Sequence, residues 1–130
     1  MNDRYLFRGK RIDNGEWVTG YYVCDPFSYN SDTILDHSPM RMHGSLISHA
    51  VIPKTVSQCI GIKDKNVKPI YEGDLINDVD DEVLYIVAWR GYRYVFVKTT
   101  TETWCEISMF DLEYIEVVGN IHENPGLLED

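Results

Sequence analysis

The segment EVLYIVAWRGYRYVFVKT, residues 82–99, decides the fold class of this chain. Its apolar residues recur with the two-residue period of a β-strand, and they fall on both faces, so both faces are expected to be covered. One face carries Val83, Tyr85, Val87 and Trp89, and the other carries Leu84, Ile86 and Ala88. Gly91 interrupts the pattern, and because glycine takes positive φ without strain, a β-hairpin is predicted to turn there.

The same alternation runs through most of the chain and predicts a mainly β protein. Strands are expected over 4–8, 16–23, 45–52, 55–62, 71–77, 103–109 and 114–121, and the DNG sequence at 13–15 predicts a hairpin between the first two. Residues 25–44 are rich in Asp, Ser, Pro and Asn and are interpreted as a loop-rich insert. Asn124 and Pro125 are expected to begin a short C-terminal helical turn.

Length and composition limit the possible classes. A chain of 130 residues fits one domain, and 44% apolar with 25% charged residues is typical of a folded globular protein. The net charge of −9 disfavours non-specific nucleic-acid binding, which depends on Lys and Arg displacing counterions. We therefore expect a single domain over 1–130 that does not coat DNA or RNA.

The cysteines and the N-terminus bear on location. Cys24, Cys59 and Cys105 are an odd number without CxxC spacing, which is typical of a reducing compartment. The opening MNDRYLFRGK lacks the apolar core of a signal peptide, and no stretch reaches the roughly 20 apolar residues that span a bilayer. We expect a cytoplasmic protein with no membrane contact.

A second segment, GIKDKNVKPIYEGDLI at 61–76, has two interpretations. In the favoured one it is architectural: residues 63–66 turn, Pro69 begins a strand, and Gly73 with Asp74 makes a tight bend or bulge. In the other, Glu72 and Asp74 form a carboxylate pair on one face of a strand, usable for metal binding or acid–base chemistry.

Three blocks of sequence together resemble the YopX family of bacteriophage and prophage proteins. They are FRGKRIDNGEWVTGYYV at 7–23, GIKDKNVKPIYEGDLI at 61–76, and VVGNIHENPGLLE at 117–129. The resemblance implies a compact, mainly β fold, a small SH3-like β-barrel with antiparallel hairpins, encoded on mobile bacterial elements. It supplies no catalytic residue. Its motif residues in the second block are Tyr71, Glu72, Gly73 and Asp74.

One position departs from the family pattern. Members of the family usually have a glycine in the turn where this chain has Val67, which predicts a different turn geometry after Asn66. The departure lies inside the second block.

Motifs that carry catalysis or hold metals are not found in the sequence. It contains no GxSxG elbow, no P-loop and no GxGxxG. His37, His43 and His49 recur without zinc-site spacing, and the acidic run at 78–82 lacks the glycine and the distal glutamate of a calcium loop. We expect no enzyme activity, no cofactor and no metal.

The aromatic residues provide the best evidence for a binding surface. Tyr21, Tyr22, Tyr92, Tyr94 and Trp104 cannot all lie inside a small barrel with alternating strands. They either reach the surface as interface anchors or cover the far side of the sheet, under the insert and the C-terminal turn. The candidate interaction surface consists of Tyr92, Tyr94, Trp104, Arg90 and Arg93.

Three hypotheses of function follow. The favoured one is a non-enzymatic interaction module that binds an unknown protein partner or a second copy of itself through exposed aromatics and edge strands. The alternative is an accessory protein that binds nucleic acid through a local basic patch of Arg8, Lys10, Arg11, Arg90 and Arg93, although the net charge disfavours it. The third is a small enzyme that uses Glu72 and Asp74.

Overall fold

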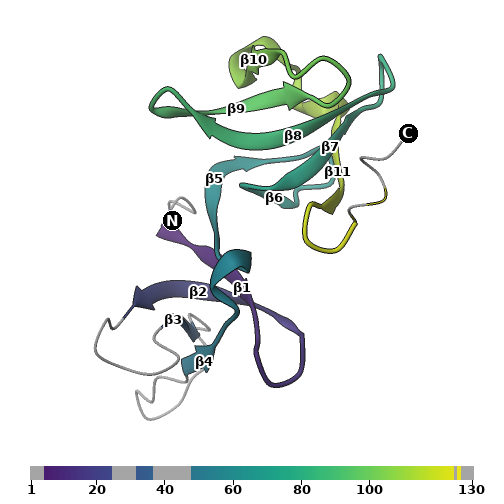
Figure 1. Ribbon diagram of the computed structural model, residues 1–130. Helices are drawn as coiled ribbons and strands as arrows, with labels where there is room; N and C mark the ends of the chain where they lie inside the picture. The colour runs from purple at the N-terminus through teal and green to yellow at the C-terminus, as the bar shows by residue number, and fades with distance from the viewer. Residues whose placement is uncertain (1–4, 25–31, 37–47, 125, 127–130) are drawn as a thin grey trace. The chain divides into compact units, whose positions relative to one another are not determined.

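The computed structural model describes residues 5–24, 32–36, 48–124 and 126 (Figure 1). The chain divides into two compact units, Met1–Cys59 and Ile60–Asp130. Its strands form two antiparallel sheets, and the described helical segments are 3-10 turns, so the expectation of a mainly β protein is confirmed. The expectation of a single domain stays a prediction.

The first unit is built on the strand order β4-β3-β2-β1-β5. The strands are β1 (Phe7–Lys10), β2 (Trp17–Cys24), β3 (Asp32–Asp36), β4 (Ser48–Ala50) and the beginning of β5 (Ser57–Lys63). The predicted DNG hairpin joins β1 to β2, with Lys10 opposite Trp17 and a φ of 74° at Gly15. A 3-10 turn, η2 (Pro53–Thr55), precedes β5.

Strand β3 corrects the interpretation of residues 25–44 as a loop-rich insert. It pairs on both sides, with Ile34 opposite Tyr22 of β2 and His49 of β4, and the Ile34 side chain is fully buried. The Tyr22 hydroxyl also donates to Asp32, and this bond, together with burial, raises the pKa of Tyr22 above its ordinary value. Pairing with β2 and β4 thus stabilises β3, which is too short and polar to be predicted from its own periodicity. Residues 25–31 and 37–44 lie outside the described part of the chain.

The second unit contains a five-stranded sheet in the order β10-β9-β8-β7-β11. Its strands are β7 (Asp74–Asp78), β8 (Val83–Arg90), β9 (Arg93–Lys98), β10 (Trp104–Glu106) and β11 (Ile115–Asn120). The later part of β5 runs beside β6 (Pro69–Tyr71), and η3 (Ile107–Met109) and η4 (Leu112–Tyr114) connect β10 to β11.

The predicted hairpin at Gly91 is confirmed. Arg90 of β8 pairs with Arg93 of β9, so only Gly91 and Tyr92 lie in the turn. Their φ angles are 56° and 75°, and positive values at both central residues are the mark of a type I′ turn, whose twist matches that of the two strands.

One face of the five-stranded sheet carries the core of the second unit. Buried side chains of the sheet meet Ile60 of β5 and Ile70 of β6 there, and the sheet residues are Ile76, Tyr85, Val87, Phe96 and Ile115. Phe110 lies against Tyr85 edge-on, with ring centroids 5.1 Å apart. This apolar face is therefore covered by β5, β6 and the segment after β10.

The predicted SH3-like barrel and the C-terminal helical turn are not confirmed. Among the described strands, β10 and β11 end the five-stranded sheet and do not pair with one another. Covering the core face with β5 and β6 removes the need for the sheet to close on itself. Residues 125 and 127–130, where most of the helical turn was expected, lie outside the described residues.

The opposite face of the same sheet is covered only in part. Leu75 and Val95 are fully buried there, whereas Ile86, Ala88 and Val97 are half-buried and line a hollow. The expectation that both faces of β8 are covered is therefore confirmed for the core face, whereas the side chains of Leu84, Ile86 and Ala88 on the other face are half-buried. In the described residues, no helix is long and apolar enough to cross a membrane.

Candidate functional site

The segment 61–76 is held in place by a buried carboxylate. Asp64 is 6% exposed, and its two oxygens accept hydrogen bonds of 2.9 Å from the backbone N–H groups of Asn66, Lys68 and Val117. Burial acts to raise the pKa of Asp64, but the three N–H donors outweigh it and the pKa lies below its ordinary value. Asp64 therefore ties the turn to β11.

The predicted motif residues form the turn between β6 and β7. Tyr71 ends β6, Glu72 and Gly73 make the turn, and Asp74 begins β7. The Asp74 carboxylate, 1% exposed, accepts from the Tyr71 N–H at 2.8 Å, and Gly73 takes a φ of 87°. The bend at Gly73 is confirmed.

The same turn joins the second and third sequence blocks. The Gly73 carbonyl accepts from the Ile121 N–H at 3.0 Å, and Asp74 pairs with Asn120 across β7 and β11. The Asn120 side chain in turn accepts from the N–H groups of His122 and Glu123. These contacts favour the architectural interpretation of both blocks over a catalytic one for Glu72 and Asp74.

Val67 adopts a backbone conformation that is typical of glycine. Its φ is 62°, in the left-handed region, and its side chain is 69% exposed. The backbone at this position thus takes a φ that favours glycine although the residue is β-branched, and the expected difference in turn geometry stays a prediction.

Four aromatic side chains lie near the turn end of the β8–β9 hairpin, and we call Trp89, Tyr92, Tyr94 and Trp104 the hairpin surface. The strand register puts Trp89 and Tyr94 on one face of the sheet and Trp104 on the other, with Tyr92 at the turn between them. Tyr92 is 93% exposed at the tip, and Trp89 and Trp104 are each about half exposed. Trp89 and Tyr94 make an edge-on pair with centroids 4.8 Å apart. A Cβ atom added to Gly91 would lie 3.8 Å from the Trp104 ring, which places β10 against the turn.

The two predicted arginines flank this surface. Arg93 forms an exposed ion pair with Glu106, 3.0 Å between nitrogen and oxygen, and Arg90 donates to the carbonyl of Trp89. All five residues of the candidate interaction surface thus lie at one end of the second unit. Arg8 belongs to the first unit, where its guanidinium lies 5.1 Å from the centre of the Trp17 ring.

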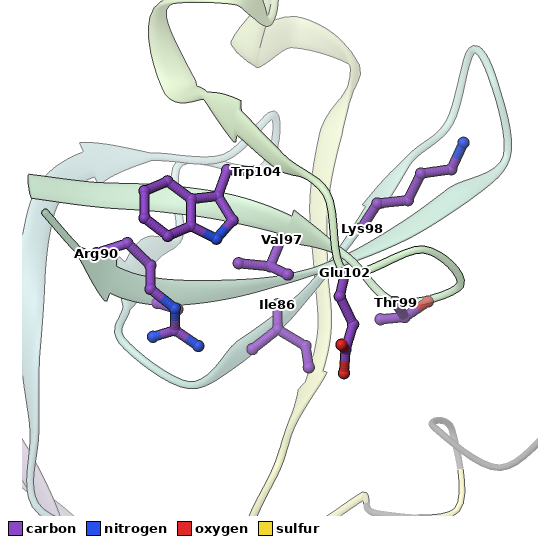
Figure 2. A pocket seen from close by; sticks show the side chains of 8 residues that line it. Ile86, Arg90, Val97, Lys98, Thr99, Glu102 and Trp104 are labelled. Carbon is purple, nitrogen blue, oxygen red and sulfur yellow. The ribbon is translucent and has the colours of Figure 1, made fainter.

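A groove of about 470 Å³ runs along the partly covered face of the sheet. Its floor consists of Ile86, Ala88 and Val97. Figure 2 shows Arg90 and Trp104 at one end and Glu102 with Thr99 at the other, while the Lys98 side chain points away. The groove therefore has an apolar floor and opposite charges at its two ends.

Sequence reasoning did not find the groove residues Ile86, Ala88, Val97 and Glu102. The sequence did carry a signal, because β8 and β9 are apolar on both faces. Among the described residues, one of these faces is only partly covered and forms the hollow. Glu102 carried no sequence signal. Its position depends on the turn after β9, in which its N–H donates to the Lys98 carbonyl at 2.8 Å.

The residues considered for metal binding are only partly within the described residues. No cluster of three or more His, Cys, Asp or Glu suited to a metal occurs among them. Of the histidines considered for zinc, His49 lies in β4, and His37 and His43 are outside the described residues. The three cysteines, all of them in the described part of the chain, form no disulfide.

Comparison with known proteins identifies the family. The chain matches the family model described as YopX protein over residues 6–129, and it belongs to this family. No curated protein matches it. A crystal structure of protein EF1440 from Enterococcus faecalis is similar, with a TM-score of 0.57, 22% identity, and coverage of 95% of this chain and 96% of that one. At this identity the likeness shows the fold alone.

Proposed function

We propose that this YopX protein is a non-enzymatic binding module that contacts a protein partner, or a second copy of itself, through the hairpin surface. The observation that carries the proposal is Tyr92. A bulky side chain 93% exposed at a φ of 75° is strained and poorly covered, and strain of this kind is found where structure serves a function. Trp89 of β8 and Trp104 of β10 lie near the same turn, on opposite faces of the sheet, and tryptophan is enriched among binding hot spots.

The chemistry of the hairpin surface favours a protein over nucleic acid. Arg93 is paired with Glu106, which leaves Arg90 as the positive side chain of this surface, and the net charge of −9 repels phosphate groups at longer range. Origin from a phage or prophage and a cytoplasmic location are parts of the same proposal. They rest on the resemblance and on the composition.

Affinity capture from a bacterial lysate tests the proposal, with the tagged protein as bait. Truncation of a hot-spot aromatic typically weakens binding by about 2 kcal/mol or more, so Tyr92→Ala and Trp104→Ala are expected to reduce the captured partner roughly 30-fold. Sedimentation of the purified protein, with and without the same substitutions, tests self-association.

Met109→Ala is the matched control, since Met109 is 78% exposed in the same unit but outside the hairpin surface. It should leave capture and sedimentation unchanged. Equal losses in all three variants, or no loss in any, would contradict a role for the hairpin surface.

A further inference from the structure

The groove beside Trp104 has a feature that the hairpin surface lacks, namely opposite charges at its two ends. Arg90 is the last residue of β8, and Glu102 lies in the turn after β9. Thr99 lines the same end of the groove as Glu102, and its N–H donates to the Leu84 carbonyl of β8. Six strand steps lead from Leu84 to Arg90, so the backbone positions at the two ends are roughly 20 Å apart along β8.

The turn that carries Glu102 is closed by backbone hydrogen bonds and holds Glu102 in a strained conformation. The Lys98 N–H donates to the Thr103 carbonyl at 2.9 Å, the Glu102 N–H donates back to the Lys98 carbonyl, and Glu102 takes a φ of 57°. Glu102 therefore resembles Tyr92, since both are non-glycine residues held at positive φ in turns that border the groove or the hairpin surface.

The floor between the two charges suits apolar side chains. Ile86 and Val97 are paired across β8 and β9, and Trp104 pairs with Val97 from β10, so the three form one row across the sheet. Ala88, one step along the same face, is small and makes the hollow. A length of about 20 Å corresponds to roughly six residues of an extended chain, whereas a free amino acid would reach only one end.

We propose that the groove binds an extended peptide segment that carries an acidic residue toward Arg90, a basic residue toward Glu102, and apolar or aromatic side chains on the floor between them. The inference deepens the proposed function, on which it rests, by naming the chemistry of the partner. Alternate residues of an extended chain face the same side, so the recognised residues recur with period two. An aromatic residue next to the acidic one would lie against the half-exposed Trp104 ring.

Blocked synthetic heptapeptides test the charge requirement on the full-length protein. The probe is acetyl-Asp-Ser-Tyr-Ser-Val-Ser-Lys-amide, whose Asp, Tyr, Val and Lys face one side, and two companions carry Asp at both ends or Lys at both ends. Binding is followed by calorimetry and by the NMR shifts of the Ile86 and Val97 methyl groups. The wild-type protein is expected to prefer the mixed probe about fivefold at low salt.

Charge reversal in the protein should move this preference predictably. Arg90→Glu makes both ends of the groove acidic and is expected to favour the peptide with two Lys. Glu102→Lys makes both ends basic and is expected to favour the peptide with two Asp. Because the prediction is a change of preference rather than a loss, a partly unfolded variant cannot imitate it.

The outcomes separate this inference from the proposed function. Tyr92→Ala should lower capture of the partner from lysate but leave the peptide affinities unchanged, since Tyr92 does not line the groove. If Tyr92→Ala still abolishes capture while the peptides bind without regard to charge, or do not shift the two methyl groups at millimolar concentration, the groove proposal is wrong and the hairpin surface stands. If capture does not depend on Tyr92 but the charge preference of the peptides follows the substitutions, the proposal for the hairpin surface is wrong and the groove proposal stands.

Discussion

Individual residues of the second unit store strain in its turns. Val67, Glu82, Tyr92 and Glu102 are the non-glycine residues with positive φ among those described. For Val67 the left-handed conformation brings the branched side chain toward the backbone, and no burial compensates, since the side chain is 69% exposed. Val67 is thus a site where stability is lost without a visible structural gain.

Replacing Val67 by glycine is expected to stabilise the protein. Relief of the left-handed strain is worth about 1–2 kcal/mol, and the extra freedom of glycine in the unfolded chain offsets part of it, leaving a gain of roughly 1 kcal/mol. Chemical denaturation of Val67→Gly against the wild type measures the difference. Val23→Gly, an exposed position in β2, is the control and should destabilise, so a loss of stability in both variants would contradict the assignment of strain to Val67.

Asp64 links residue chemistry to the pH dependence of stability. Its folded-state pKa lies below the ordinary 3.8. The ionised carboxylate therefore contributes fully to the free energy of unfolding above that value, and this contribution is lost as the pH falls toward the lowered folded-state pKa. Asp64→Asn removes an acceptor and leaves a buried N–H unpaired, which should reduce the free energy of unfolding by about 1–3 kcal/mol near neutral pH.

Denaturant unfolding between pH 3 and 6 tests whether Asp64 contributes to the pH dependence of stability. The wild-type protein should lose stability below about pH 4, and the Asp64→Asn variant should lack that part of the slope. Asp13→Asn is the control, because Asp13 also has a lowered pKa, from its bond to Arg11, but is fully solvated and should change stability little. Parallel pH profiles for the wild type and Asp64→Asn would show that Asp64 is not responsible.

At the scale of elements, close approach of β2 and β3 depends on a single glycine. A Cβ atom at Gly20 would lie 1.8 Å from the carbonyl oxygen of Leu35, a contact with backbone that neither strand can relieve without moving. Gly20 therefore explains part of the first sequence block, VTGYYV, in terms of strand pairing.

The substitution Gly20→Ala is expected to disrupt the β2–β3 pairing and lower the free energy of unfolding by about 3 kcal/mol or more, as steric overlap in a core typically does. Thermal unfolding gives the magnitude, and amide hydrogen exchange shows whether protection is lost in β2 and β3. Gly126→Ala is the control, since nothing lies within 4 Å of its added Cβ. Unchanged protection of β3 in Gly20→Ala would refute the argument.

The elements also show how far sequence reasoning reached. The hairpin at Gly91, the DNG hairpin and the bend at Gly73 were predictable because positive φ and two-residue periodicity are local properties. Strand β3 was not, because its pairing partners, such as His49 opposite Ile34, are distant in sequence. The groove could not be predicted from the sequence for a related reason. Alternation shows that Ile86 and Val97 share an apolar face, but only the packing of the sheet shows whether that face is covered.

For the whole molecule, the dominant property is a net charge of −9. Its sign sets the long-range field that any partner meets before contact, and this field repels phosphate backbones and attracts basic segments. The mixed-charge peptide proposed for the groove is neutral overall, so its recognition depends on Arg90 and Glu102 and not on the net charge.

We expect the protein to show no salt-sensitive affinity for DNA or RNA at about 150 mM salt. Fluorescence anisotropy with single-stranded and duplex oligonucleotides at several salt concentrations measures this. The double substitution Arg90→Glu and Arg93→Glu should leave the weak signal unchanged. Affinity that falls steeply with salt, and falls further in the double variant, would instead support the nucleic-acid alternative.

The bond between Asp64 and the Val117 N–H also has a consequence for folding kinetics. It joins groups 53 positions apart, so the chain must close a long loop before the bond can form, whereas the β8–β9 hairpin closes through a turn of two residues. The hairpin is therefore suited to early formation and the Asp64 bond to late formation. Loss of Asp64 should then speed unfolding and leave the folding rate nearly unchanged, so this carboxylate sets how long the native state lasts rather than how quickly it is reached.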